Sequence, residues 1–265
     1  MRYSFMTFST PELPLAEILA MAKDFGYDGI EPRIGSGQRH GIELASSPEA
    51  RHDAWQLAEA QQIAFACVAT SCVFANPETN GQHRADLAQA IALAADIGAP
   101  CIRVFGGQIP AGVTREAAIA LVAESLLSVA DLAEQRGVSV CLETHDDWCN
   151  PAHVAEIMRQ VDHPAIAVNW DIMHPVRTAG VTIDDSFALL RPWIRHLHIH
   201  DGTPGEPLTL LPIGEGAIDH RRAIALLYQL GYTGFLSGEW IGWEPAAIHL
   251  PRELATLKRY ESGVS

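Results

Sequence analysis

The feature that most restricts the fold of this 265-residue chain is a pattern that repeats along it. An Ala/Leu-rich helical pattern is followed by a glycine or a short polar break, and a run typical of a β-strand comes next. Residues 22–31 (AKDFGYDGIE) and 228–239 (YQLGYTGFLSGE) both show this order, with glycine where a helix C-terminus favours a left-handed residue. Repeated helix–strand units predict an α/β fold built on parallel strands.

Eight β-like runs alternate with eight helical patterns. The expected strands are residues 3–8, 29–34, 64–69, 101–105, 138–144, 165–171, 195–201 and 235–240. The expected helices lie near 13–25, 48–61, 81–97, 114–136, 151–161, 184–191, 219–230 and 246–260. This alternation predicts a (β/α)8 TIM barrel. A doubly wound sheet is the alternative, but no GxGxxG turn follows the first strand. No linker or low-complexity segment divides the chain, so residues 1–265 are expected to form a single domain.

Charge and composition restrict the partners of the protein. A formal net charge of −14 opposes contact with a phosphate backbone, so nucleic acid is not an expected partner. No apolar run approaches the length of a membrane span, and the N-terminus has no signal-peptide pattern. We therefore expect a cytoplasmic protein without membrane contact, and the sequence leaves the formation of a homo-oligomer open.

The five cysteines are an odd number and form no compact framework. They stand at positions 67, 72, 101, 141 and 149, mostly within apolar, strand-like runs. Reduced, buried cysteines that pack as small apolar residues are the favoured interpretation. Because no CxxC pair is present, a structural zinc site is not expected.

Acidic residues stand at the ends of three expected strands. Glu143, Asp171 and Glu239 end the fifth, sixth and eighth strands, and the seventh carries three histidines in alternation, His196, His198 and His200. In a TIM barrel the carboxyl ends of the strands hold the active site. A single acid there is equally well a helix cap or an ion-pair partner. Three carboxylates together, however, favour one divalent cation, with Mn²⁺ or Mg²⁺ preferred and Co²⁺ or Zn²⁺ also compatible.

The order of the motifs resembles that of the xylose isomerase-like TIM barrels, the sugar phosphate isomerase/epimerase superfamily. The motifs are FGYDGIE, LETH, NWDxxH, HLHxxD, GEGxID and GEW, and together they span nearly the whole chain. The resemblance implies that Glu143, Asp171, His198 and Glu239 bind one divalent metal. It thereby selects the middle histidine, a choice that strand alternation alone leaves open.

Candidate substrate contacts come from the same comparison and from the strand ends. His174 matches a substrate-contacting histidine of ketose 3-epimerases, and His145 and His200 are further candidates beside the metal. Other candidates in the barrel are Glu31, Arg103 and Trp240, although ion pairs inside the barrel or core packing would explain these residues equally well.

The chain also departs from the ketose 3-epimerases. Cys149 and Pro204 stand where those enzymes carry a glutamate and an arginine. The departure weakens the specific 3-epimerase assignment and leaves the predicted metal ligands unchanged.

The resemblance implies an isomerase or epimerase of a sugar or keto-polyol, acting by proton transfer through a metal-stabilised enediolate. Glu143 and Glu239 would serve as base and acid. A dehydratase using the same site is the alternative, since loss of a β-hydroxyl needs the same first step. An abasic-site endonuclease is disfavoured by the charge of −14 and by the absence of histidines from the third and fourth expected strands. A non-catalytic sugar-binding protein is the remaining alternative.

Overall fold

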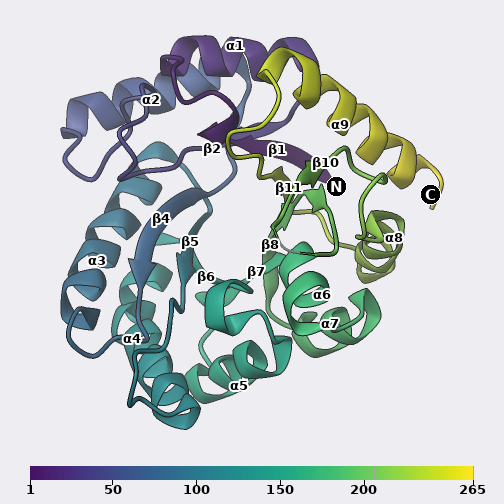
Figure 1. Cartoon of the computed structure of the whole chain (residues 1–265). Coiled ribbons are helices and arrows are strands. Elements are labelled where there is room, and N and C mark those ends of the chain that lie inside the picture. The colour runs from purple at the N-terminus through teal and green to yellow at the C-terminus, as the bar shows by residue number, and fades with distance from the viewer. Residues whose placement is uncertain (206, 265) are drawn as a thin grey trace.

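The computed structural model describes residues 1–205 and 207–264, and in it a ring of helices surrounds a barrel of strands (Figure 1). The strands that form the barrel are β1 (Arg2–Met6), β2 (Gly29–Glu31), β3 (Ala64–Phe65), β4 (Val68–Val73), β5 (Cys101–Phe105), β6 (Ser139–Glu143), β7 (Ile166–Asp171), β8 (Ile194–Ile199) and β11 (Phe235–Gly238). They form one sheet in the order β3-β2-β1-β11-β8-β7-β6-β5-β4. Every pairing in this sheet is parallel, and the predicted TIM-barrel fold is confirmed.

The third barrel position is divided between two short strands. β3 pairs with β2 at Gly29 and Ala64, whereas β4 pairs with β5 at Val68 and Ile102. A single parallel bridge between Arg33 and Ala69 closes the ring beyond the interruption. The sequence predicted one continuous strand here because the run AFACVA is apolar throughout and contains no turn residue.

One helix covers each barrel position on the outside. These helices are α1 (Leu15–Phe25), α2 (Pro48–Gln61), α3 (Asn80–Ile97), α4 (Arg115–Arg136), α5 (Pro151–Val161), α7 (Ile183–Leu190), α8 (His220–Leu230) and α9 (Ala246–Ser262). Side chains of Ser47, Thr114 and Asn150 cap helix N-termini. Thr182 caps α7 and Asp184 lies in its first turn, so this helix starts one residue before the expected position.

Two elements on the carboxyl side of the barrel were not predicted. Helix α6 (Met173–Ala179) follows β7 directly, and it is too short to show a helical period. The strands β9 (Asp201–Gly202) and β10 (Leu210–Leu211) form an antiparallel hairpin after β8. Both elements follow the ends of barrel strands that carry predicted site residues.

Alternate residues of each strand face two different environments, as predicted. Val140, Leu142 and Trp170 belong to the large apolar core between strands and helices. Inside the barrel a separate small cluster contains Cys67, Cys101, Cys141 and Ala167. All five cysteines are free and buried, which confirms the prediction of reduced, buried thiols.

The last helix, α9, closes the ring of helices against the first strand. The hydroxyl of Tyr3 donates to Glu261 Oε2 at 2.7 Å, and the terminal amino group of Met1 donates to Oε1 at 2.7 Å. Tyr27 also donates to the carbonyl of Leu250 at 2.9 Å. Among the described helices, none combines the length and apolar character that a membrane crossing requires.

Candidate metal centre

The four predicted metal ligands come together at the carboxyl ends of neighbouring strands. Glu143 and Asp171 end β6 and β7, His198 lies in β8, and Glu239 follows β11. Each side chain offers one ligand atom, and these four atoms all lie within 4.8 Å of one another. The register explains the convergence, because Asp171 and Ser237 both pair with His198 across adjacent strands.

His198 lies between carboxylates on both sides of its ring. Its Nδ1 is 2.9 Å from Glu143 Oε1 and 3.3 Å from Glu239 Oε2, and its Nε2 is 3.0 Å from Glu31 Oε1. Burial lowers the pKa of His198, but these carboxylates outweigh burial and raise the pKa well above its ordinary value. Burial raises the pKa of Glu239, and the positive charge of His198 lowers that pKa to about 2. His198 and Glu239 therefore form a pair of opposite charges in the centre.

Asp171 is held in place by its own backbone and by two histidines. Its Oδ1 accepts hydrogen bonds from the amides of Met173 and His174, at 2.8 and 3.1 Å. Its Oδ2 lies 2.9 Å from His200 Nε2 and 3.8 Å from His174 Nε2. Burial raises the pKa of Asp171, but the two imidazoles outweigh burial and lower it. The first turn of α6 thus fixes the direction of this carboxylate.

Arg103 supports Glu143 from the neighbouring strand. Its Nε lies 3.2 Å from Glu143 Oε2, and its Nη1 donates to the carbonyl of Thr70 at 2.9 Å. The guanidinium also lies 3.9 Å from the ring centre of Phe105. Arg103 is therefore an ion-pair partner inside the barrel, and its role as a substrate contact stays a prediction.

Glu31 bridges two histidines below the centre. Its Oε2 lies 2.8 Å from His196 Nε2, while Oε1 meets His198. Burial raises the pKa of Glu31, but His198 and His196 outweigh burial and lower it well below its ordinary value. A buried ionised carboxylate here orients both rings, and its predicted contact with substrate stays untested.

Three of the predicted substrate contacts line an open pocket beside the centre. His145, His174 and His200 share this pocket with Glu239. The ring centres of His145 and His174 are 4.5 Å apart, and those of His174 and His200 are 5.6 Å apart. Burial lowers the pKa of His145, but its hydrogen bond to Asp146 and the charge of Glu143 raise the pKa to about 9. The carboxylate of Glu239 and the three imidazoles therefore line the same pocket.

Trp240 is not brought to this pocket. Its side chain is 1% exposed and packs against His249, with ring centres 5.2 Å apart. The indole occupies the apolar core, which is the alternative that the sequence left open.

The sequence did not single out the apolar residues that complete the pocket. Leu208 and Leu210 come from the hairpin segment after β8, and Ile241 follows Trp240. Leu208 is 36% exposed and Ile241 is 56% exposed. The sequence signal that could have identified them is the presence of large apolar residues in loops directly after barrel strands.

The sequence analysis also did not single out Asn169. Neither polar atom of its buried side chain has a hydrogen-bond partner among the described residues.

Parallel strands that carry acids and histidines at their carboxyl ends, inside a ring of helices, make this chain a TIM-barrel protein. A sequence profile of the xylose isomerase-like TIM barrel matches residues 19–259, and the chain belongs to this family. Its solved structural neighbours are sugar epimerases and dehydratases of the same superfamily.

Individual relatives illustrate this membership. The chain is 27% identical over 159 residues to a 3-dehydroshikimate dehydratase of Bacillus anthracis, an alignment that covers 53% of this chain and 56% of that protein. The chain therefore spans little more than half the length of this curated relative.

Two solved structures share the fold over nearly the whole chain. The probable 3-DHS dehydratase AsbF of Bacillus anthracis superposes with a TM-score of 0.81 at 21% identity, covering 97% of this chain and 99% of that one. A D-psicose 3-epimerase of Clostridium cellulolyticum, solved with D-tagatose, gives a TM-score of 0.79 at 16% identity, covering 100% and 99%.

Proposed function

We propose that this protein is a divalent-metal-dependent enzyme that moves a proton next to the carbonyl group of a sugar or keto-polyol. The observation that carries the proposal is the convergence of Glu143, Asp171, His198 and Glu239 beside an open pocket. Three buried carboxylates repel one another unless a cation lies among them. Oxygen donors with one imidazole fit Mn²⁺ or Mg²⁺ best, so the residues present suit such an ion.

In this proposal the two glutamates act as base and acid. Glu143 and Glu239 approach Nδ1 of His198 from different strands, at 2.9 and 3.3 Å. Glu239 lines the open pocket, so in this proposal its carboxylate takes the proton from a substrate bound there. When bound, the metal ion stabilises the negative charge that develops on the carbonyl oxygen. Return of a proton to the same carbon from the opposite face epimerises the substrate, and return to the neighbouring carbon isomerises it.

A dehydratase is the second candidate, and the histidine row of the pocket favours it. His145 has its pKa raised to about 9, so it is protonated at neutral pH. A protonated imidazole beside Glu239 is able to give a proton to a leaving hydroxyl group. The 27% identity with a 3-dehydroshikimate dehydratase supports the same candidate.

Product analysis in deuterated water separates these activities. The Mn²⁺-loaded protein is incubated with a panel of ketoses and keto-polyols. Deuterium at carbon with an unchanged molecular formula supports an isomerase or epimerase, whereas loss of one water supports a dehydratase. If no compound of the panel gives either result, the proposal is contradicted and a binding protein is favoured.

The substitution Glu239→Gln tests the role of this residue. The amide neither accepts the proton nor carries charge, so we expect turnover to fall by at least about 100-fold. Circular dichroism should show an unchanged fold. Glu244→Gln is the matched control, because Glu244 pairs with Arg252 and does not line the pocket, and it should keep full activity. Full activity in Glu239→Gln contradicts the assignment.

A further inference from the structure

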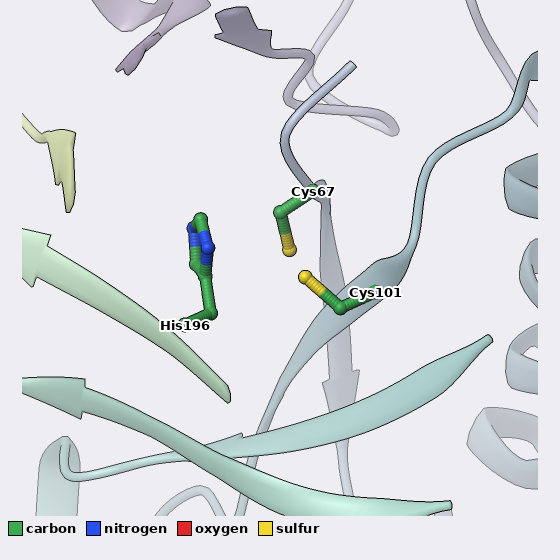
Figure 2. Close-up of side chains that lie close together, drawn as sticks. All are labelled: Cys67, Cys101 and His196. Carbon is green, nitrogen blue, oxygen red and sulfur yellow. The ribbon is translucent and has the colours of Figure 1, made fainter. Parts of the chain in front are cut away.

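A second group of metal-ligating side chains lies deeper in the barrel. Cys67, Cys101 and His196 each offer one ligand atom, and these three atoms lie within 4.8 Å of one another. Figure 2 shows the two thiols and the imidazole turned toward one another across the interior. His196 precedes His198 by two residues in β8, which places it about 6.6 Å deeper along the strand. The group is therefore separate from the carboxylate centre.

These residues meet because of the barrel topology. Cys67 lies in the interruption between β3 and β4, Cys101 begins β5, and His196 comes from β8 on another side of the barrel. Their exposed fractions are 0%, 4% and 1%. The three side chains come from separate parts of the barrel, and their burial holds them close together.

The donor atoms are those that thiophilic ions select. Thiolate sulfur with imidazole nitrogen is the ligand type of structural Zn²⁺ sites, which are usually four-coordinate. A third cysteine, Cys141 of β6, packs with Cys67 and Cys101 in the small cluster inside the barrel. It does not belong to the three-ligand group, so the protein supplies three donors to this site.

The orientation of His196 matches that of a metal ligand. Its Nε2 lies 2.8 Å from Glu31 Oε2, which leaves Nδ1 as the ring nitrogen open to another partner. In Figure 2 one ring nitrogen lies on the side of the two sulfur atoms. A carboxylate that holds the outer nitrogen of a metal-bound histidine is the usual support for such a ligand.

We propose that Cys67, Cys101 and His196 form a second and buried site that binds Zn²⁺ or another thiophilic cation. Binding breaks the S–H bonds of the coordinating thiols and forms metal–sulfur bonds. The released protons go to solvent, and no electron is transferred. Burial raises the pKa of the Cys67 thiol to about 12, which disfavours a role of this cysteine as a nucleophile. The site ties together strands from three sides of the barrel and is independent of the proposed activity.

Cobalt substitution tests the site through its spectrum. The full chain is produced in medium containing Co²⁺, because buried ligands take up metal during folding. Only thiolate ligands give a sulfur-to-Co²⁺ charge-transfer band, and the carboxylate centre has none. We expect this band in the wild-type protein, with two metal ions bound per chain. Asp171→Asn, which removes a ligand of the other centre, should leave the band unchanged.

Matched variants assign the band to these residues. Cys67→Ser/Cys101→Ser should lose the band and one of the two bound ions. Cys72→Ser should keep both, since Cys72 is a buried cysteine of β4 outside the cluster. A wild-type protein without the band, whose five thiols remain titratable after unfolding, overturns the proposal and leaves these cysteines as core packing. Persistence of the band in the double variant overturns it as well. The wild-type spectrum decides alone if that variant does not fold.

Discussion

Glu31 is a fully buried carboxylate whose charge is balanced by two imidazoles. Its two oxygens meet His196 at 2.8 Å and His198 at 3.0 Å. These contacts involve Nε2 of each ring, so the two Nδ1 atoms are directed away from Glu31. Nδ1 of His198 faces Glu143. One side chain from β2 thus sets the orientation of residues in both candidate metal sites.

Substitution of Glu31 by glutamine should damage both stability and metal binding. The amide keeps the shape but removes the charge and one of the two acceptors. We expect a loss of about 1–3 kcal/mol in the free energy of unfolding, because a buried donor is left unpaired. Affinity for Mn²⁺ at the carboxylate centre should fall about 10–100-fold.

Urea unfolding and calorimetric titration with Mn²⁺ measure these two effects. Glu59→Gln, an exposed position of α2, is the control and should change neither quantity. An unaltered Mn²⁺ affinity in Glu31→Gln would show that Glu31 does not orient His198.

The spacing of acids along the sequence was enough to predict part of the site. Glu143, Asp171 and Glu239 were recognisable because each ends a β-like run, and family motifs then selected His198. The contact between Glu31 and His198 was beyond sequence reasoning, since 167 residues separate them. The cysteine cluster was not predicted from the sequence for the same reason. Its members lie on different strands without a CxxC spacing, so only the closed barrel brings them together.

At the scale of elements, the loop after β5 is locked to the short helix η2 (Asp146–Trp148). Trp148 is fully buried, and its Nε1 donates to the carbonyl of Gly107 at 2.7 Å. A Cβ atom at Gly106 would overlap the indole of Trp148. Because His145 immediately precedes η2, this packing also sets the wall of the pocket.

The substitution Gly106→Ala should therefore destabilise the protein by about 1–3 kcal/mol through overpacking. Gly81→Ala is the control, since a Cβ at Gly81 in the first turn of α3 meets nothing within 4 Å. That control should be neutral or stabilising by up to about 1 kcal/mol. Thermal unfolding of both variants provides the comparison, and equal stabilities would contradict the packing argument.

Element positions were predictable wherever period and caps agreed. The bounds of α2 and α5 were predicted as they are, because Ser47-Pro48 and Asn150-Pro151 mark their starts. The interruption of the third strand and the hairpin of β9 and β10 were not predicted. Both consist of pieces of two to six residues, and pairing with neighbours decides their bounds more than local sequence does.

For the whole molecule, closure of the helical ring depends on Glu261 of α9. Burial raises the pKa of this carboxyl, but the hydrogen bonds from the terminal amino group and from Tyr3 lower it below its ordinary value. A carboxyl with a lowered folded-state pKa stabilises the fold above its unfolded pKa of about 4.3. That contribution is lost as the pH falls through the lower, folded-state value.

We therefore expect Glu261→Gln to be less stable than wild type at neutral pH, by about 0.2–1 kcal/mol. The difference should shrink as the pH falls below the unfolded pKa of about 4.3 and vanish once the pH is below the lower, folded-state pKa of Glu261. Urea unfolding between pH 7 and pH 3 measures the trend, with Glu12→Gln, an exposed position, as the control. A difference that grows on acidification would contradict the sign of the argument.

Because the third strand is divided, strand pairing is not equally extensive around the barrel. β3 contributes two residue pairs to β2, and the pairing of β4 with β5 is irregular between Ala69 and Val73. Local opening costs least where ladder hydrogen bonds are fewest. We therefore expect the barrel to open locally at the divided third strand, while the strands from β6 to β8 on the opposite side stay paired. Cys67 lies in this interruption, so local opening there should bring solvent and ions to its buried thiol.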